Sequence, residues 1–174
     1  MARQTSIPYR SAMSKATARL QPTPAAAGDL LKLDLQLCFA LYSSNNLMSR
    51  LYRPLLEPLG LTYPQYVAMM ALWETSPQTV GALGRRLSLD SGTLTPLFKR
   101  LESAGLVVRE RDPADQRRVL IALTDAGAAL KAKAADIPWT MLCQLPLPPE
   151  EASSLKGVLA RLASGLGEIV SDAD

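Results

Sequence analysis

The chain has 174 residues, 48% of them hydrophobic, which is enough for one domain with a sizeable core. It contains no histidine and two cysteines, which excludes histidine-based acid–base catalysis, Ser-His-Asp triads and the usual structural zinc sites. The net charge is only +3, yet residues 84–118 carry eight basic and five acidic residues. Such a basic segment is typical of nucleic-acid binders, although a solvated charged face is an equal alternative.

The N-terminal segment, residues 1–28, carries four basic residues and no acidic ones: Arg3, Arg10, Lys15 and Arg19. It shows no helical stripe, so we predict a disordered basic arm, with a transit peptide as the alternative. No apolar run is long enough to span a membrane, and a signal peptide's apolar region is missing. Two widely separated cysteines do not form a disulfide framework. We therefore expect a cytoplasmic, reduced protein without a membrane partner.

The first predicted helix begins near residue 29, where apolar and aromatic residues recur at helical spacing: Leu31, Leu35, Cys38 and Tyr42. It is expected to run to about Arg53, because Pro54 and Pro58 follow. Thr62 and Gln65 form a T-x-x-Q capping box, which predicts a second helix to about Glu74.

Two shorter helices follow a turn at Ser76-Pro77. Thr79 is predicted to cap the stretch VGALGRRLS, and Asp90 or Ser91 the stretch GTLTPLFKRLESAG. Pro96 lies deep in the latter, so its first turn is expected to be irregular, and Gly105 ends it.

The remaining elements are a hairpin and the terminal helices. The runs LVVRERD and RRVLIAL are rich in β-formers and are joined by DPADQ, which predicts a β-hairpin. Thr124 opens a helix through Lys133, with a break near Pro138, and residues 150–170 form the last helix. This order predicts a mainly α fold with a small β-hairpin wing: a winged helix-turn-helix within a helical frame.

In a helix-turn-helix the second helix enters the major groove. Ser91, Thr93 and Thr95 are short hydroxyl side chains suited to phosphates or base edges, and Lys99 and Arg100 are candidates for backbone contacts. The same stretch has an apolar side, which is expected to be buried: Leu94, Leu97, Phe98 and Leu101.

The hairpin tip carries Arg117 and Arg118 on a turn too short to bury them. An arginine projecting from a wing gains from the negative potential of a narrow minor groove. A plain surface hairpin, with Asp112, Asp115 and Arg117 in salt bridges, is the alternative.

The runs LYRPLLEPLGLTYPQYVAMMALWE and LGRRLSLDSGTLTPLFKRLESAGLVVRERDPADQRRVLIALTDAG resemble MarR-type winged-helix repressors. Asp115 and Arg117 match the family's D-x-R wing motif, which gives Asp115 the role of wing support. The resemblance implies a homodimer on double-stranded DNA, at a pseudo-palindromic operator. It divides a single domain, 29–174, into a DNA-binding lobe at about 62–123 and dimerisation helices at about 29–53 and 124–170.

Within that family, Cys38, Tyr52, Tyr63 and the run LDSGTLTPL resemble the organic hydroperoxide sensors. This resemblance implies a repressor that releases DNA when an organic hydroperoxide oxidises Cys38. Tyr52 and Tyr63 would hydrogen-bond the sulfur, with Tyr42 nearby and Cys143 as the resolving cysteine. No metal or cofactor is expected.

Helix geometry bears on this site. An unbroken helix from Cys38 to Tyr52 would separate them by about 21 Å, so the helix breaks or Tyr52 meets the cysteine of a partner chain. We favour a site built across a dimer.

Two other functions remain open. One is a MarR-type regulator that responds to a small aromatic ligand, with Cys38 structural and Cys143 simply packed against its neighbours. The other is a thiol peroxidase, disfavoured because the chain has no histidine and no obvious arginine near Cys38.

Overall fold

The computed structural model describes residues 31–171, so the predicted basic arm at 1–28 lies outside the described residues. Contacts divide the chain into two compact units. Residues 46–146 form one, and the described residues 31–45 and 147–171 belong to the other. Helix α2, Leu37–Leu56, contributes to both.

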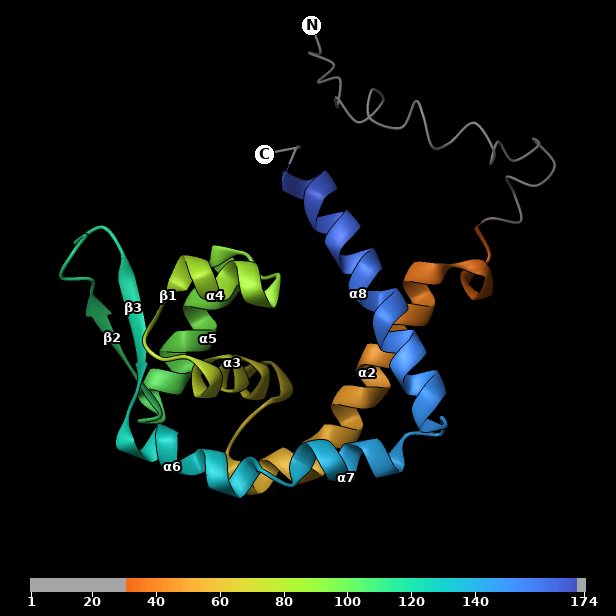
Figure 1. Ribbon diagram of the computed structural model, residues 1–174, viewed down its shortest axis with the longest axis horizontal. Helices are drawn as coiled ribbons and strands as arrows, with labels where there is room; N and C mark the ends of the chain where they lie inside the picture. Colours follow the sequence, from red (N-terminus) through yellow and green to blue (C-terminus); the bar gives the residue numbers. More distant parts are fainter. Residues whose placement is uncertain (1–30, 172–174) are drawn as a thin grey trace, which may run out of the picture. The chain divides into compact units, whose positions relative to one another are not determined.

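The unit of residues 46–146 is mainly helical and carries a small sheet (Figure 1). After α2 and the 3-10 turn η6 (Glu57–Leu59), its elements are α3 (Tyr63–Glu74), β1 (Gln78–Thr79), α4 (Val80–Leu87), α5 (Ser91–Ser103), β2 (Val107–Arg111), β3 (Val119–Leu123), α6 (Asp125–Ala134) and α7 (Ile137–Gln144). The predicted mainly α fold with a β-hairpin wing is confirmed.

The sheet is antiparallel, with strand order β1-β3-β2. In the predicted hairpin, register runs from Val107 opposite Leu123 to Arg111 opposite Val119. Strand β1 was not predicted. It has two residues and exists only because Gln78 pairs with Ile121, far along the chain.

The helix starts agree with the predicted caps. Gln65 Oε1 accepts the Thr62 amide N–H at 2.8 Å, as the capping box requires. Side-chain oxygens of the other cap residues accept first-turn amides: Thr79 Oγ1 from Ala82 (3.1 Å), Asp90 Oδ1 from Thr93 (2.9 Å) and Thr124 Oγ1 from Gly127 (3.0 Å). Asp90, and not Ser91, is thus the cap of α5.

The core of this unit lies where α3 packs against α4, α5 and α6. Its fully buried larger side chains include Leu56, Tyr66, Phe98 and Ile121. Burial of each is favourable by about 1.5–3 kcal/mol relative to exposure.

The junction of α6 with the hairpin is unusually close. A Cβ added to Gly127 would lie 2.0 Å from the Leu106 carbonyl oxygen. That oxygen accepts the Thr124 amide at 3.1 Å, and Trp73 Nε1 donates to the Gly127 carbonyl at 2.8 Å. Gly127 therefore lets α3, α6 and the base of the wing meet.

Both ends of α2 and the first turn of α5 differ from the predictions. Helix α2 begins at Leu37, not near residue 29, and a 3-10 turn at Leu33–Leu35 precedes it. It also continues past Pro54 to Leu56, so this proline costs α2 one internal hydrogen bond without ending it. Helix α5 is continuous through Pro96, and its predicted irregular first turn is absent. The predicted break near Pro138 lies between α6 and α7, with Pro138 in the first turn of α7.

The other unit has the 3-10 turn, the first turns of α2 and helix α8, Pro149–Ser171. Its apolar side chains are largely exposed: Leu31, Leu33, Leu35, Leu37, Leu155, Val158, Leu159, Leu166, Ile169 and Val170. Exposed apolar patches of this kind are typical of association surfaces. Among the described residues no helix is long and apolar enough to cross a membrane.

Candidate DNA interface and thiol site

Helix α5 has the predicted two sides. Its buried residues are those of the expected apolar side: Leu94, Leu97, Phe98 and Leu101. The candidate DNA-contacting residues are all exposed: Ser91, Thr93, Thr95, Lys99 and Arg100. The packing of α5 on the core thus leaves these five side chains available to a partner.

Two of these hydroxyl groups already donate their protons within the helix. Thr93 Oγ1 donates to Asp90 Oδ2 at 2.9 Å, and Thr95 Oγ1 donates to the Ser91 carbonyl at 2.8 Å. Each oxygen can then only accept a hydrogen bond from a ligand, and both threonines are exposed. Adenine and cytosine offer amino donors in the major groove, and thymine offers a methyl group.

The pair of bonds to Thr93 also affects Asp90. Hydrogen bonds from the Thr93 amide and hydroxyl hold the pKa of the Asp90 carboxyl below its usual range. Asp90 stays ionised and keeps the start of α5 capped.

The wing is organised by Asp115. Its carboxylate accepts from Arg117 Nε at 3.1 Å and lies 3.3 Å from Arg118 Nε. The Arg117 hydrogen bonds, and then the Arg118 charge, lower the pKa of Asp115. The Arg117 side chain nevertheless remains 92% exposed, so Asp115 orients it without covering it.

Asp112 has a different part in the hairpin. Its Oδ1 accepts the Ala114 amide at 2.9 Å, and no ion pair of Asp112 with Arg117 occurs among residues 31–171. Of the two carboxylates considered from the sequence, Asp115 therefore pairs with arginines of the hairpin and Asp112 accepts a backbone amide instead.

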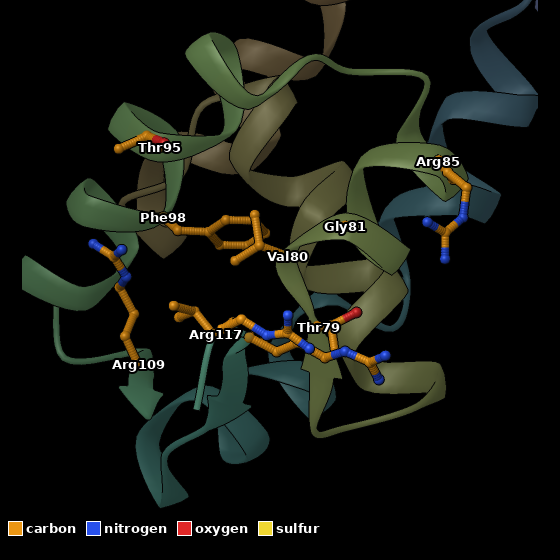
Figure 2. A pocket seen from close by; sticks show the side chains of 10 residues that line it. Thr79, Val80, Gly81, Arg85, Thr95, Phe98, Arg109 and Arg117 are labelled. Carbon is orange, nitrogen blue, oxygen red and sulfur yellow. The ribbon is translucent and has the colours of Figure 1, made fainter. Parts of the chain in front are cut away.

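An open cleft of about 560 Å³ lies between the start of α4, helix α5 and the wing (Figure 2). Its lining includes four arginines: Arg85, Arg109, Arg117 and Arg118. Arg85 and Arg109 were not singled out from the sequence. The signal was present in the basic segment 84–118, but spacing alone does not show that a residue of α4 and one of β2 line the same cleft.

Both cysteines are free, exposed thiols in the single chain. Cys38 is the second residue of α2, and Tyr42 lies one turn further along the same helix, 65% exposed. Cys143 is the penultimate residue of α7. The two thiols belong to different units of the chain.

Two of the predicted tyrosines come together. The ring centroids of Tyr52 and Tyr63 are 4.7 Å apart, and Tyr66, which the sequence did not single out, lies 5.9 Å from Tyr52. Burial, then the neighbouring Tyr63 and Tyr66, raise the pKa of Tyr52. Tyr52 therefore remains a protonated hydrogen-bond donor throughout the physiological range.

The structure bears on the geometry of the thiol site. Helix α2 is unbroken between Cys38 and Tyr52, so these residues are about 21 Å apart along its axis. A helix break, one of the two possibilities left open, is thereby excluded. Tyr63 also lines an open hollow of about 580 Å³, together with Arg53, Glu57 and Leu61. Within residues 31–171 no three His, Cys, Asp or Glu side chains are grouped to hold a metal ion.

Residues 61–119 match the model of the MarR family. The chain is also 49% identical over 138 residues to the organic hydroperoxide resistance transcriptional regulator of Bacillus subtilis, covering 79% of this chain and 94% of the relative. The chain belongs to the MarR family. The predicted family is thus confirmed.

Solved MarR-family structures superpose on this chain and support the same assignment to the family. Reduced AbfR bound to DNA superposes with a TM-score of 0.69 at 36% identity, covering 83% of this chain and 99% of AbfR, a protein of Staphylococcus epidermidis. A disulfide form of AbfR superposes with a TM-score of 0.53 at 35% identity, covering 86% and 99% of the two chains.

Proposed function

We propose that this chain is a homodimeric transcriptional repressor that binds operator DNA and releases it when an organic hydroperoxide oxidises Cys38. The observation that carries the proposal is the free, exposed Cys38 thiol on a chain that also has an exposed recognition helix and wing. The 49% identity to the Bacillus subtilis regulator supports the choice of oxidant. No cofactor is needed, and we expect the protein to act in the cytoplasm.

The DNA-binding role rests on α5 and the wing. Ser91, Thr93 and Thr95 face the major groove, Lys99 and Arg100 contact phosphates, and Arg117 and Arg118 reach the minor groove, with Asp115 orienting both. Two copies reading half-sites one helical turn apart imply a pseudo-palindromic operator.

Dimerisation explains the exposed apolar side chains of α2 and α8. Leu37 of α2 and Leu166 and Ile169 of α8 are each more than half exposed in the single chain. Helix α2 and residues 124–170 are proposed to supply the dimerisation helices, with the DNA-binding lobe at about 62–123. Within one chain the unbroken α2 keeps Cys38 away from Tyr52. In the proposed dimer, Cys38 of the partner subunit lies beside the Tyr52–Tyr63 pair instead.

The chemistry of the switch begins with the Cys38 thiolate. Its sulfur attacks the terminal oxygen of the hydroperoxide and takes up the OH group as the O–O bond breaks. The alkoxide leaves and takes a proton to become an alcohol, so sulfur is oxidised to a sulfenic acid. The hydroxyl groups of Tyr52 and Tyr63, with Tyr42 nearby, are suitable donors to the sulfur.

Cys143 completes the switch as the resolving thiol. The Cys143 thiolate of the partner subunit attacks the sulfenic sulfur, hydroxide leaves as water after protonation, and a disulfide joins the chains. Forming this bond moves the helical frame and alters the spacing of the recognition helices. Affinity for a fixed half-site spacing then falls.

The test has two readouts on the same samples. Purified protein receives one equivalent of cumene hydroperoxide and is run on a non-reducing gel, and its binding to a duplex selected from a random pool is measured by fluorescence anisotropy. The expected result is a band of twice the monomer mass, reversed by dithiothreitol, with loss of DNA binding. Cys38→Ser is expected to lose both responses.

Cys143→Ser separates the two thiols. It is expected to form no intersubunit disulfide, and its sulfenic acid is instead capped by added glutathione, visible in the intact mass. Release of DNA by peroxide from Cys38→Ser contradicts the sensor assignment, and an intersubunit disulfide in Cys143→Ser contradicts the resolving role.

The other functions give different outcomes. A regulator that responds to a small aromatic ligand would still bind DNA, and still release it, after treatment with a thiol-blocking reagent. Turnover of peroxide with a thiol reductant would identify a peroxidase, and we expect only a single equivalent to be consumed.

A further inference from the structure

The cleft between α4, α5 and the wing is strongly basic. Among residues 31–171, four arginines line it and no acidic residue does. Asp115 lies beside it and pairs with Arg117 and Arg118. Among the described residues Arg85 and Arg109 form no ion pair, although Glu102 and Glu110 line a neighbouring hollow with Arg109. Two guanidinium groups are therefore available to an anion.

These two guanidinium groups come from different elements. Arg85 folds back toward the start of its own helix, where its Nη1 lies 3.8 Å from the position of a Cβ built on Gly81. Figure 2 shows Arg109 extending from β2 toward α5, with Val80 and Phe98 between it and Arg85. The guanidinium groups of Arg85 and Arg109 thus lie on either side of the apolar floor of the cleft, which includes Val80 and Phe98.

The floor strengthens the binding of an anion. Phe98 is 1% exposed, and Val80 and Val119 are half-buried. Charge–charge attraction is larger beside low-dielectric side chains than in open water. Arginine also presents paired N–H groups that match the oxygens of a phosphate.

The position of the cleft selects the kind of anion. Thr95 of α5 lines it on one side and Arg117 of the wing on another. In duplex DNA a single sugar–phosphate strand separates the major groove from the minor groove. A duplex that meets α5 in one groove and the wing in the next must place that strand over this cleft.

We propose that the cleft seats the sugar–phosphate strand between the two grooves, with Arg85 and Arg109 as its phosphate contacts. The inference rests on the proposed DNA-binding function and adds two residues outside the recognition helix and the wing tip. Because every sequence offers the same phosphates, these contacts position the protein and do not read bases.

The test measures salt dependence. Arg85→Gln and Arg109→Gln are titrated with the selected operator and with an unrelated duplex, over a range of salt concentrations. Each lost phosphate contact is expected to reduce the slope of log K against log salt by about 0.9. Affinity for both duplexes is expected to fall by the same factor, so that the ratio between them is unchanged.

A second arm locates the phosphate. Operators carrying one neutral methylphosphonate at successive positions are bound to wild type and to Arg109→Gln. At the contacted position the modification is expected to weaken the wild type and to leave Arg109→Gln unaffected, because the two changes remove one interaction.

Lys133→Gln is the matched control, since it removes one exposed positive charge on α6, outside the cleft lining. It is expected to keep the wild-type slope, and circular dichroism checks that all variants are folded. Unchanged slopes in both arginine variants, or a loss confined to the operator, overturn the inference. Failure of the wild type to bind any duplex overturns the proposed function instead.

Discussion

Replacing Gly127 with alanine tests how closely α6 approaches the base of the wing. The new Cβ would lie 2.0 Å from the Leu106 carbonyl oxygen, where ordinary contacts are 3.4–4 Å. Backbone must therefore move by about 1.4 Å, the difference between 3.4 and 2.0 Å. Overpacking costs about 1–3 kcal/mol. The substitution would also weaken the Thr124–Leu106 hydrogen bond, which adds about 1 kcal/mol.

Better helix propensity of alanine offsets about 1 kcal/mol of this cost, so the free energy of unfolding is expected to fall by about 2 kcal/mol. Urea denaturation followed by circular dichroism measures it. Gly81→Ala in α4 is the matched control, because its Cβ position meets only the flexible end of Arg85, at an ordinary 3.8 Å. It is expected to gain up to about 1 kcal/mol. A Gly127→Ala protein as stable as the wild type would refute the close approach.

Two further predictions concern the turn of the helix-turn-helix and the wing. Ser88 has φ 54°, a left-handed conformation that disfavours side chains, so Ser88→Gly is expected to raise the unfolding free energy by about 0.5 kcal/mol. A loss in the same urea titration would contradict this. The lowered pKa of Asp115 means that its support of Arg117 is complete above the ordinary value of 3.8 and disappears as pH falls through the folded value. The protection of the Arg118 amide against hydrogen exchange, relative to its intrinsic rate, is expected to be high at pH 6 and to fall only below pH 3.8, as the pH passes through the lowered pKa of Asp115; this amide bonds the Asp115 carbonyl. Asp115→Asn should abolish that acid dependence.

Local signals predicted most of the fold. The Thr62–Gln65 capping box, the Thr124 cap and the hairpin each depend on residues within a few positions of one another. Strand β1 depends on a partner more than forty positions away, and two residues cannot show alternation. The start of α2 was placed too early, because apolar spacing continues through the 3-10 turn at Leu33–Leu35 and only backbone dihedrals distinguish the two.

The candidate site was predicted unevenly for the same reason. Tyr52 and Tyr63 were named, and their rings do meet. Tyr66 was not named, because a tyrosine near the start of α3 resembles an ordinary core residue. Only the fold shows that its ring lies close to that of Tyr52 on α2. Arg85 and Arg109 became candidates only when the fold placed both on the lining of one cleft.

The contact of Trp73 with its neighbours has an optical consequence. Its ring stands edge-on to Tyr66 with centroids 6.1 Å apart, and its Nε1 is hydrogen-bonded to the backbone of α6. Indole emission changes in colour and intensity with such surroundings. The second tryptophan, Trp139, is 69% exposed in the single chain. With Trp139→Phe, the protein carries a single tryptophan, at the junction of α3 and α6, and any separation of the two helices becomes visible as a shift of its emission spectrum without an attached dye.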